Sequence, residues 1–386
     1  MDAIELAAVL AAAVVVASML SVELGIAVAL FELGLGVVLG NISDLNTSEP
    51  WLVFVASFAS IVLTFLAGAE VDPDDFKERF GATMAIGIVS FLGPFVVAFG
   101  VSYWLLDWTL KAALISGTAL STTSLAVVYA VLVETGLNAT RVGKLLMGAC
   151  FVTDLGTALA LSAIFITPNV WFPVFLAVSV ALMLALPRVA PWFFRRYGDR
   201  VIEPEIKLVF LCLFVLMVLA DASKGHAVLP AFILGLVMAR HYQQHRVEQE
   251  RLRVVAFAFL TPFFFLRGGL NVSLAAVVAN IGLLAVLFGA KMIPKLGLVL
   301  PFARRAEPEH GVFITLLMST GLTFGTISSL YGLNAGIIDK TQFSLLVTVV
   351  VLSAIVPTAI AQVFFSPGHI SDIERRRHPI PAEEIV

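Results

Sequence analysis

Charged side chains are scarce in this 386-residue chain, and their scarcity excludes most soluble architectures. Only 13% of the residues are Asp, Glu, Lys or Arg, whereas 60% are hydrophobic. A soluble domain carries roughly 25% charged residues. The composition therefore predicts an integral membrane protein with several spans.

Cysteine is nearly absent as well, and motifs for catalysis are missing. Cys150 and Cys212 both fall inside apolar stretches, so we interpret them as small buried residues and not as a disulfide framework. The chain has no phosphate-binding loop, no GxSxG nucleophile motif and no aromatic-rich basic patch. We expect no enzyme, no cofactor and no nucleic-acid partner. The amino terminus lacks the basic stretch of a secretory signal, so we expect its first helix to remain.

Long apolar runs are what the sequence has in place of these features. Runs of about 17–25 residues can cross a bilayer as helices. The chain has about thirteen, covering residues 3–20, 22–40, 51–70, 82–106, 110–133, 143–166, 169–193, 205–222, 225–240, 254–270, 273–302, 310–331 and 341–366. This pattern predicts an all-α polytopic fold, with one transmembrane domain over residues 1–370 and a short cytoplasmic tail over 371–386.

Basic residues segregate to alternate connections between these runs. Of the 24 Lys and Arg residues, 18 lie on one side, within residues 77–79, 141–144, 188–207, 240–253, 304–305 and 375–377. Because cytoplasmic loops are enriched in Lys and Arg, we expect the amino terminus outside and the carboxyl terminus in the cytoplasm.

Two runs carry hydroxyl and glycine residues at mid-span. The fifth contains Gly117–Ser124, with five hydroxyls in eight residues, and the twelfth contains Ser319–Thr326. Glycine and β-branched residues weaken a helix, and a broken helix inside a membrane usually lines a cavity. The two stretches are seven spans apart, so they run in opposite directions. They predict crossed broken helices in two inverted repeats, about 22–166 and 225–366. The alternative is that the small residues only allow close helix packing.

Asp154 is a single acid near the middle of the apolar run from Leu145 to Ile166. A carboxylate at the bilayer centre costs roughly 2.5–3.5 kcal/mol on the mildest scale, so we expect it to bind an ion or a proton. The alternative is a structural pair with a basic residue on a neighbouring helix. Hard alkali cations prefer oxygen ligands, which nearby hydroxyls supply; the candidates are Thr122, Thr123, Ser124, Thr153 and Thr157.

Several segments resemble one family of transporters. The segments are Glu32–Gly36 with Gly40, Phe65–Glu70 before a basic loop, Gly117–Ser124, Thr153–Asp154, and Pro262–Phe265 followed by Gly268–Leu270. Their order is similar to that in the second family of bacterial monovalent cation–proton antiporters, over essentially the whole chain. The resemblance implies a sodium–proton antiporter-like fold and exchange of Na⁺, Li⁺ or K⁺ for H⁺. It also implies a homodimer that acts in pH homeostasis in a bacterial or archaeal plasma membrane.

The chain departs from the family pattern at two positions. Electrogenic members have two adjacent aspartates, whereas this chain has Thr153 before Asp154. Many relatives have an arginine–glycine–glutamate triplet where this chain has Thr320-Gly321-Leu322. With one titrating carboxylate, the simplest stoichiometry is one proton per cation, which is electroneutral. Protons and cations would compete for Asp154, because burial disfavours the bare anion.

Three basic residues lie within the spans, and for two of them, Lys291 and Arg267, alternative roles remain open. The resemblance places Lys291 as the partner of the acid, either as a structural cation or as a group that releases its proton. Lys295 lies closer to the cytoplasmic face, where we expect its ammonium to reach the surface. Arg267 is a gate or pairing residue, or an interfacial anchor. Thr320 and Thr323 complete the predicted helix crossing, and Glu32 and Glu70 are interpreted as packing or entrance charges.

Other classes of function remain open from the sequence. The main alternative is a sodium-coupled carrier for organic anions such as bile acids, since one fold hosts several cargoes. A channel would need a ring of charges along a pore, and a non-transporting receptor is a further alternative. His241 and His245 lie four residues apart, but nothing else supports a metal site there.

Overall fold

The structure, a computed structural model, describes residues 3–24, 27–43, 45, 47–70, 80–135, 137, 140–165, 169–198, 200–223 and 225–365. Every regular element within these residues is a helix, as the composition predicts. The expected basic residues Lys77 and Arg79, and the expected tail over 371–386, lie outside the described residues.

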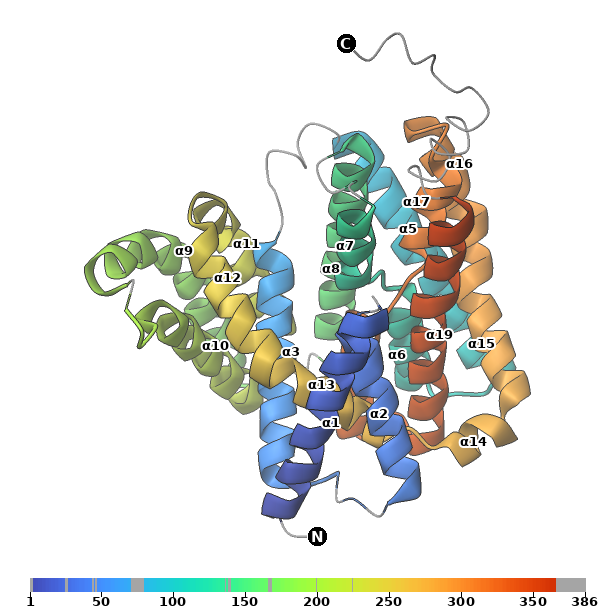
Figure 1. The fold of residues 1–386 in the computed structure, drawn as a ribbon, viewed down its shortest axis with the longest axis horizontal. Coiled ribbons are helices and arrows are strands. Elements are labelled where there is room, and N and C mark those ends of the chain that lie inside the picture. Colours follow the sequence, from blue (N-terminus) through green and yellow to red (C-terminus); the bar gives the residue numbers. More distant parts are fainter. Residues whose placement is uncertain are drawn as a thin grey trace.

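A helix or a broken helix occupies each predicted run (Figure 1). The first half contains α1 (Ala3–Leu24), α2 (Val28–Ile42), α3 (Pro50–Ala69), α5 (Phe80–Gly100), α6 (Leu110–Ser121), α7 (Leu125–Glu134), α8 (Arg141–Phe165) and α9 (Phe172–Tyr197). The second half contains α10 (Pro204–Ala222), α11 (Val228–Gln244), α12 (Arg246–Val255), α13 (Thr261–Leu270), α14 (Leu274–Ala279), α15 (Ile281–Pro294), α16 (Leu300–Ala306), α17 (Gly311–Met318), α18 (Thr323–Asn334) and α19 (Lys340–Phe364). Three π-helical turns extend these helices, at Val101–Leu105, Ala256–Leu260 and Lys295–Val299.

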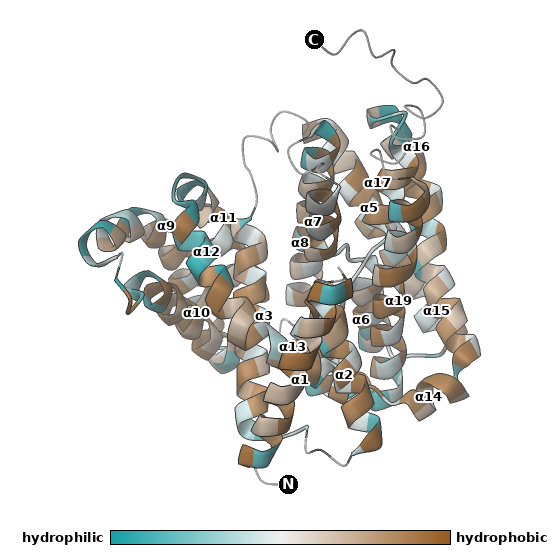
Figure 2. Ribbon diagram, viewed as in Figure 1, coloured by the Kyte–Doolittle hydropathy of each residue, from teal (hydrophilic) through white to brown (hydrophobic). Residues whose placement is uncertain are grey.

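Ten stretches of the described chain are long and apolar enough to cross a membrane, and α2 is a shorter apolar helix. Helices α10 and α11 fill the predicted runs 205–222 and 225–240 but are not among the ten. The count of thirteen spans therefore stays a prediction. Hydrophobic residues predominate along α14 and α15, while hydrophilic residues gather on α12 and at the end of α16 (Figure 2).

The described helices pack as two groups that contact each other. In the first group α2 packs along α13 and α3 packs along α11. In the second, α5 packs on α6, α8 and α15, while α18 packs on α6 and α19. Contacts of α11 with α8 and of α13 with α18 join the groups, and the site described below lies between them.

Glycines allow the first group to pack backbone against backbone. A Cβ at Gly36 of α2 would overlap the Leu266 carbonyl of α13, and one at Gly269 would overlap the Leu33 carbonyl. The same reciprocal contact joins Gly68 of α3 and Gly235 of α11. In the two predicted repeats α2 corresponds to α11, and α3 corresponds to α13. Exchanging the repeats therefore converts the pair of α2 and α13 into the pair of α11 and α3, as expected of an inverted repeat.

We expect Gly36→Ala to lower the stability of the protein by about 1–3 kcal/mol, because the added methyl group forces α2 away from α13. The matched control is Gly34→Ala on the same helix, where a Cβ meets no atom within 4 Å. Thermal unfolding of both variants in one detergent measures the difference. Equal unfolding midpoints would show that the close contact does not limit stability.

Candidate functional site

The two predicted broken helices cross at the centre of the structure. Helix α6 ends at Ser121, where Thr122 adopts an extended conformation, and α7 begins at Leu125. Helix α17 ends at Met318, and α18 begins at Thr323. The breaks touch, since the Ser124 amide donates a hydrogen bond to the Thr320 carbonyl at 3.3 Å. The crossing is confirmed, and packing by small residues alone does not describe it.

Lys295 holds the two breaks together. Its ammonium group is fully buried and donates to the carbonyls of Thr122, at 2.9 Å, and Met318, at 2.7 Å. It also donates to the Thr123 hydroxyl at 2.9 Å. Both carbonyls lie at helix carboxyl ends, which carry partial negative charge. The expectation that Lys295 reaches the membrane surface is wrong, because the side chain points into the crossing.

Lys291 lies one turn earlier on the same face of α15 and is also fully buried. Its ammonium lies 3.5 Å from the Thr122 carbonyl and occupies the space that a side chain at Gly321 would fill. The described residues show no ion pair between Asp154 and either lysine. Lys291 therefore adjoins the crossing, but its predicted pairing with the acid is not present in this conformation.

Asp154 lies on α8 with 1% of its surface exposed, and its Oδ1 atom has no hydrogen-bond partner among the described residues. A buried charge without a partner is expensive. The acid faces a cavity that is also lined by Leu125 and Thr323, the first residues of α7 and α18. Helix amino ends carry partial positive charge, so the starts of α7 and α18 favour a carboxylate here. Lys295 binds the carboxyl ends of α6 and α17, the other halves of the two broken helices.

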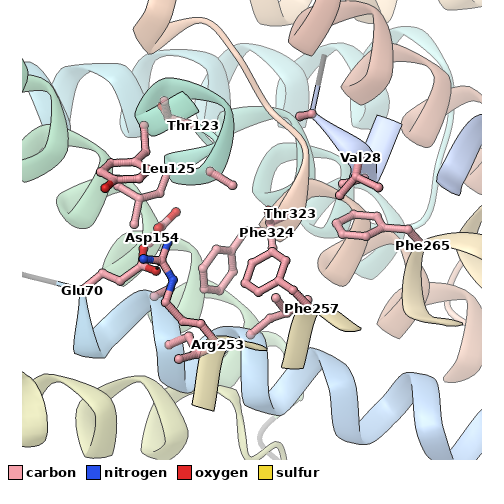
Figure 3. Close-up of a pocket in the computed structure, with 17 residues that line it drawn as sticks. Val28, Glu70, Thr123, Leu125, Asp154, Arg253, Phe257, Phe265, Thr323 and Phe324 are labelled. Carbon is pink, nitrogen blue, oxygen red and sulfur yellow. Dashed lines mark ion pairs between the residues drawn. The ribbon is translucent and has the colours of Figure 1, made fainter. Parts of the chain in front are cut away.

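The cavity has a volume of about 210 Å³ and is mostly apolar. Figure 3 shows Asp154, Glu70 and Arg253 at one end, with Val28 and Phe265 at the other. Glu70 and Arg253 form an ion pair at 3.1 Å, and their side chains are 18% and 35% exposed. Because these two side chains are partly exposed, they mark the mouth of the cavity.

Only some of the predicted ligands line this cavity. Asp154 and Thr123 do, and so does Thr323, which was predicted only as part of the helix crossing. The other predicted hydroxyls mostly bond to carbonyls of their own helix or break. Thr153 donates to Cys150, and Thr157 donates to Thr153. The remaining predicted residues that do not line it are Thr122, Ser124, Thr320, Lys291 and Arg267.

Arg267 does not line the cavity and lies near the carboxyl end of α13. It donates to the Thr47 carbonyl at 3.3 Å and to the Asn334 side chain at 3.1 Å. These bonds tie α13 to the end of α18 and favour an anchoring role over pairing with Asp154. In the described residues no group of three or more His, Cys, Asp or Glu residues is suited to hold a metal ion.

The comparison with known proteins decides the family. A family model described as "Sodium/hydrogen exchanger, transmembrane" matches residues 8–366. The chain belongs to this family. The predicted resemblance is thereby confirmed, and no comparison supports the organic-anion carrier.

Individual relatives of this exchanger agree with the family match. The probable Na⁺/H⁺ antiporter 3 of Methanocaldococcus jannaschii is 26% identical over 344 residues, 84% of this chain and 86% of the relative. The cation/H⁺ antiporter 18 of Arabidopsis thaliana is 24% identical over 338 residues, 81% of this chain but 41% of that longer protein. The solved structure of the sodium proton antiporter MjNhaP1 from M. jannaschii at pH 8 has a TM-score of 0.71 and 12% identity, covering 94% of this chain and 98% of that chain. It shows the same fold.

Two polar residues that line the exchanger's cavity, Arg253 and Tyr129, were not among the predicted site residues. Arg253 was counted among the loop residues, but it belongs to α12, which continues through a π-helical turn into α13. Its position directly before the apolar run 254–270 could have predicted that it lies at the end of a membrane-spanning helix. Glu70 was predicted to be a packing or entrance charge; it lines the cavity, and its side chain is 18% exposed.

Proposed function

We propose that this exchanger moves one Na⁺ against one H⁺ by competition at Asp154. The observation that carries the proposal is the buried carboxylate oxygen without a partner, facing a cavity with a polar mouth. A proton or a cation at this oxygen removes the cost of the bare charge. Only the occupied, neutral site is then easily moved past the apolar barrier, which prevents leak of either ion.

The ligands nearest to Asp154 are oxygen atoms, as an alkali cation requires. Thr123 and Thr323 line the same cavity. The Thr123 hydroxyl already bonds Met318 and Lys295, so we assign it one remaining lone pair and assign Thr323 the larger share of hydroxyl coordination. Thr153 and Thr157 are supporting residues in this proposal, because they do not line the cavity.

Exchange at a single carboxylate is electroneutral in this mechanism. Lys295 donates three hydrogen bonds in the crossing, and a lysine that released its proton could not keep all three. We therefore assign Lys295 a permanent positive charge, and of the two predicted roles of Lys291 we adopt the structural one. Neither lysine then adds a second proton to the transport cycle.

The mouth of the cavity faces the cytoplasm in our proposal. Arg253 belongs to the side of the chain that is rich in Lys and Arg, which is cytoplasmic by the positive-inside rule. This orientation places the amino terminus outside and the carboxyl terminus inside a bacterial or archaeal plasma membrane. A homodimer formed by outer helices of the first repeat is part of the same proposal and rests on the family resemblance.

Proteoliposomes that contain the purified protein and a pH-sensitive dye test the function. Na⁺, Li⁺ and K⁺ are added in turn, with and without valinomycin to set the membrane potential. We expect cation-driven proton movement that does not depend on the potential, and the most active ion defines selectivity. Proton flux that follows the potential would contradict one-for-one exchange, and no flux with any of the three ions would overturn the proposal.

We expect Arg253→Gln to lower the apparent KM for Na⁺ about two- to fivefold at low ionic strength, because it removes a positive charge from the mouth and frees Glu70. The effect should shrink in high salt, which screens partly exposed charges. Arg251→Gln is the matched control. Arg251 pairs with Glu203 at 3.6 Å with similar exposure but does not line the cavity. Equal changes in both variants would assign the effect to general surface charge.

A further inference from the structure

Hydrogen bonds between side chains join the end of α18 to the first group of helices. The Ser60 hydroxyl of α3 donates to the Ser57 carbonyl, so it accepts from Tyr331 of α18, at 3.0 Å. Asn334, three residues after Tyr331, accepts a bond of 3.1 Å from Arg267 of α13. Helices α3 and α13 belong to the first group and α18 belongs to the second. These two bonds therefore cross the surface on which the groups meet.

The order of residues along the helices places these bonds on the side of the cavity away from its mouth. Going back along α3 from Glu70 at the mouth, Leu63 lines the cavity, and Ser60 follows about one turn later. On α18, Phe324 lines the cavity, and Tyr331 follows about two turns later. Both helices therefore lead from the cavity to the bonded pair and away from the mouth.

A second, much smaller cavity lies at these bonds. It is lined by Ser60, Tyr331 and Asn334, together with Phe264 of α13 and Ile327 of α18. Its volume is about 10 Å³, which leaves room for one water molecule at most. A hydrated alkali cation cannot pass through this space. The route to Asp154 is therefore closed on this side while its other side has a mouth.

Two further contacts hold the bonded side chains in place. The ring of His226, in the connection between α10 and α11, packs edge-on against the Tyr331 ring with centroids 4.1 Å apart. The Arg267 guanidinium also donates to the Thr47 carbonyl at 3.3 Å, in the connection between α2 and α3. Each donor to the crossing bonds is thus oriented by a second segment of the chain.

From these contacts we infer that Tyr331 and Asn334 of α18 form a latch with Ser60 and Arg267, which keeps the outer end of the exchange route closed. The latch breaks when the two groups of helices move apart on this side, and Asp154 then becomes accessible from there. Because the latch bonds exist only in the closed state, they set how much of the protein is open on the outer side. Only the role of the latch in transport rests on the proposed exchange at Asp154.

Thiol labelling measures how often the latch opens. Ala56 lines the small cavity and is fully buried, so a cysteine introduced by Ala56→Cys reacts with a membrane-impermeant reagent only when this side opens. We expect Tyr331→Phe to raise the labelling rate from the outer face about fivefold, the effect of losing one hydrogen bond, because the ring itself is kept. The matched control is Tyr103→Phe, which should leave the rate unchanged, since Tyr103 is exposed and lines neither cavity. The two native cysteines are buried, and the protein without Ala56→Cys gives the background.

Asn334→Asp tests the other bond of the latch in the opposite direction. A carboxylate gives Arg267 a charge-assisted partner in place of a neutral one. Labelling of the Ala56→Cys protein should slow about two- to threefold, a modest effect because position 334 is exposed to solvent. The slower rate should appear with a cationic and with an anionic reagent, which separates a tighter latch from attraction or repulsion by the added charge.

The two variants together decide the inference. Equal labelling of Tyr331→Phe and the unaltered latch, faster labelling of Asn334→Asp, or labelling only from the Arg253 face would each overturn it. Labelling needs no transported ion. Absence of cation-driven proton flux would therefore overturn the proposed function, while the labelling rates would still decide whether the latch exists.

Discussion

Replacing Asp154 by asparagine is expected to abolish cation-coupled proton flux and to leave the protein at least as stable as wild type. Asparagine has the same shape but cannot exchange a proton or supply a negative charge to a cation. The wild-type carboxylate is buried with one oxygen unpartnered, so its removal takes away a destabilising group. Proteoliposome flux and thermal unfolding of the same preparation measure both effects.

Asp339→Ala is the matched control for this variant and should show the opposite pattern. Asp339 caps α19, where its carboxylate accepts from the Gln342 amide in a capping box. Loss of the cap costs about 1 kcal/mol, so unfolding should occur at lower temperature while flux persists. If Asp154→Asn kept its flux, competition at this carboxylate would be wrong. If it lost stability together with flux, Asp154 would be a structural residue.

Lys295→Met is expected to have the largest effect on stability of any single substitution in the crossing. It removes donors to two helix-end carbonyls and one hydroxyl in the membrane interior. A hydrogen bond to a charged group contributes roughly 1.5–3 kcal/mol, and relief of the buried charge offsets only part of the loss. The apparent unfolding temperature in detergent should fall by several degrees.

Lys291→Met separates a specific role of Lys295 from the general effect of a buried lysine. Lys291 is equally buried but has a single hydrogen bond, of 3.5 Å. Its replacement should therefore cost less than half as much. A larger loss of stability for Lys291→Met than for Lys295→Met would show that Lys291 is the main structural cation, which was one of its two predicted roles.

Periodicity and composition were sufficient to predict the helices, the crossing and the acid. The helices follow from long apolar runs. The crossing and the acid are exceptions within such runs: hydroxyl and glycine residues at mid-span mark the crossing, and a charge inside an apolar run marks the acid. Lys291 and Lys295 could not be separated in this way. They lie four residues apart on one helix face, and which ammonium reaches the crossing depends on how α15 and its π-helical turn pack against the breaks. That information is three-dimensional.

Arg253 illustrates a second limit of sequence reasoning. Its charge predicts a position outside the apolar run, and α12 does carry it toward the surface. Its contact with Glu70 joins residues from different helices and can be found only from tertiary structure. The same holds for Thr123 and Thr323, which line the cavity, and for Thr153 and Thr157, which do not, since hydroxyl content alone does not give direction.

The bonds of Lys295 also have a consequence for how the chain is made. The Thr122 carbonyl accepts a hydrogen bond from Lys295, which lies 173 residues later in the sequence. Thr122 therefore leaves the ribosome long before Lys295 is synthesised. Until α15 is inserted, the first break exposes backbone polar groups that the hydrocarbon cannot satisfy. The nascent first half must therefore keep this break hydrated or shielded by the insertion machinery. The helix crossing is completed only late in biogenesis, when the Met318 carbonyl accepts a hydrogen bond from the same ammonium group.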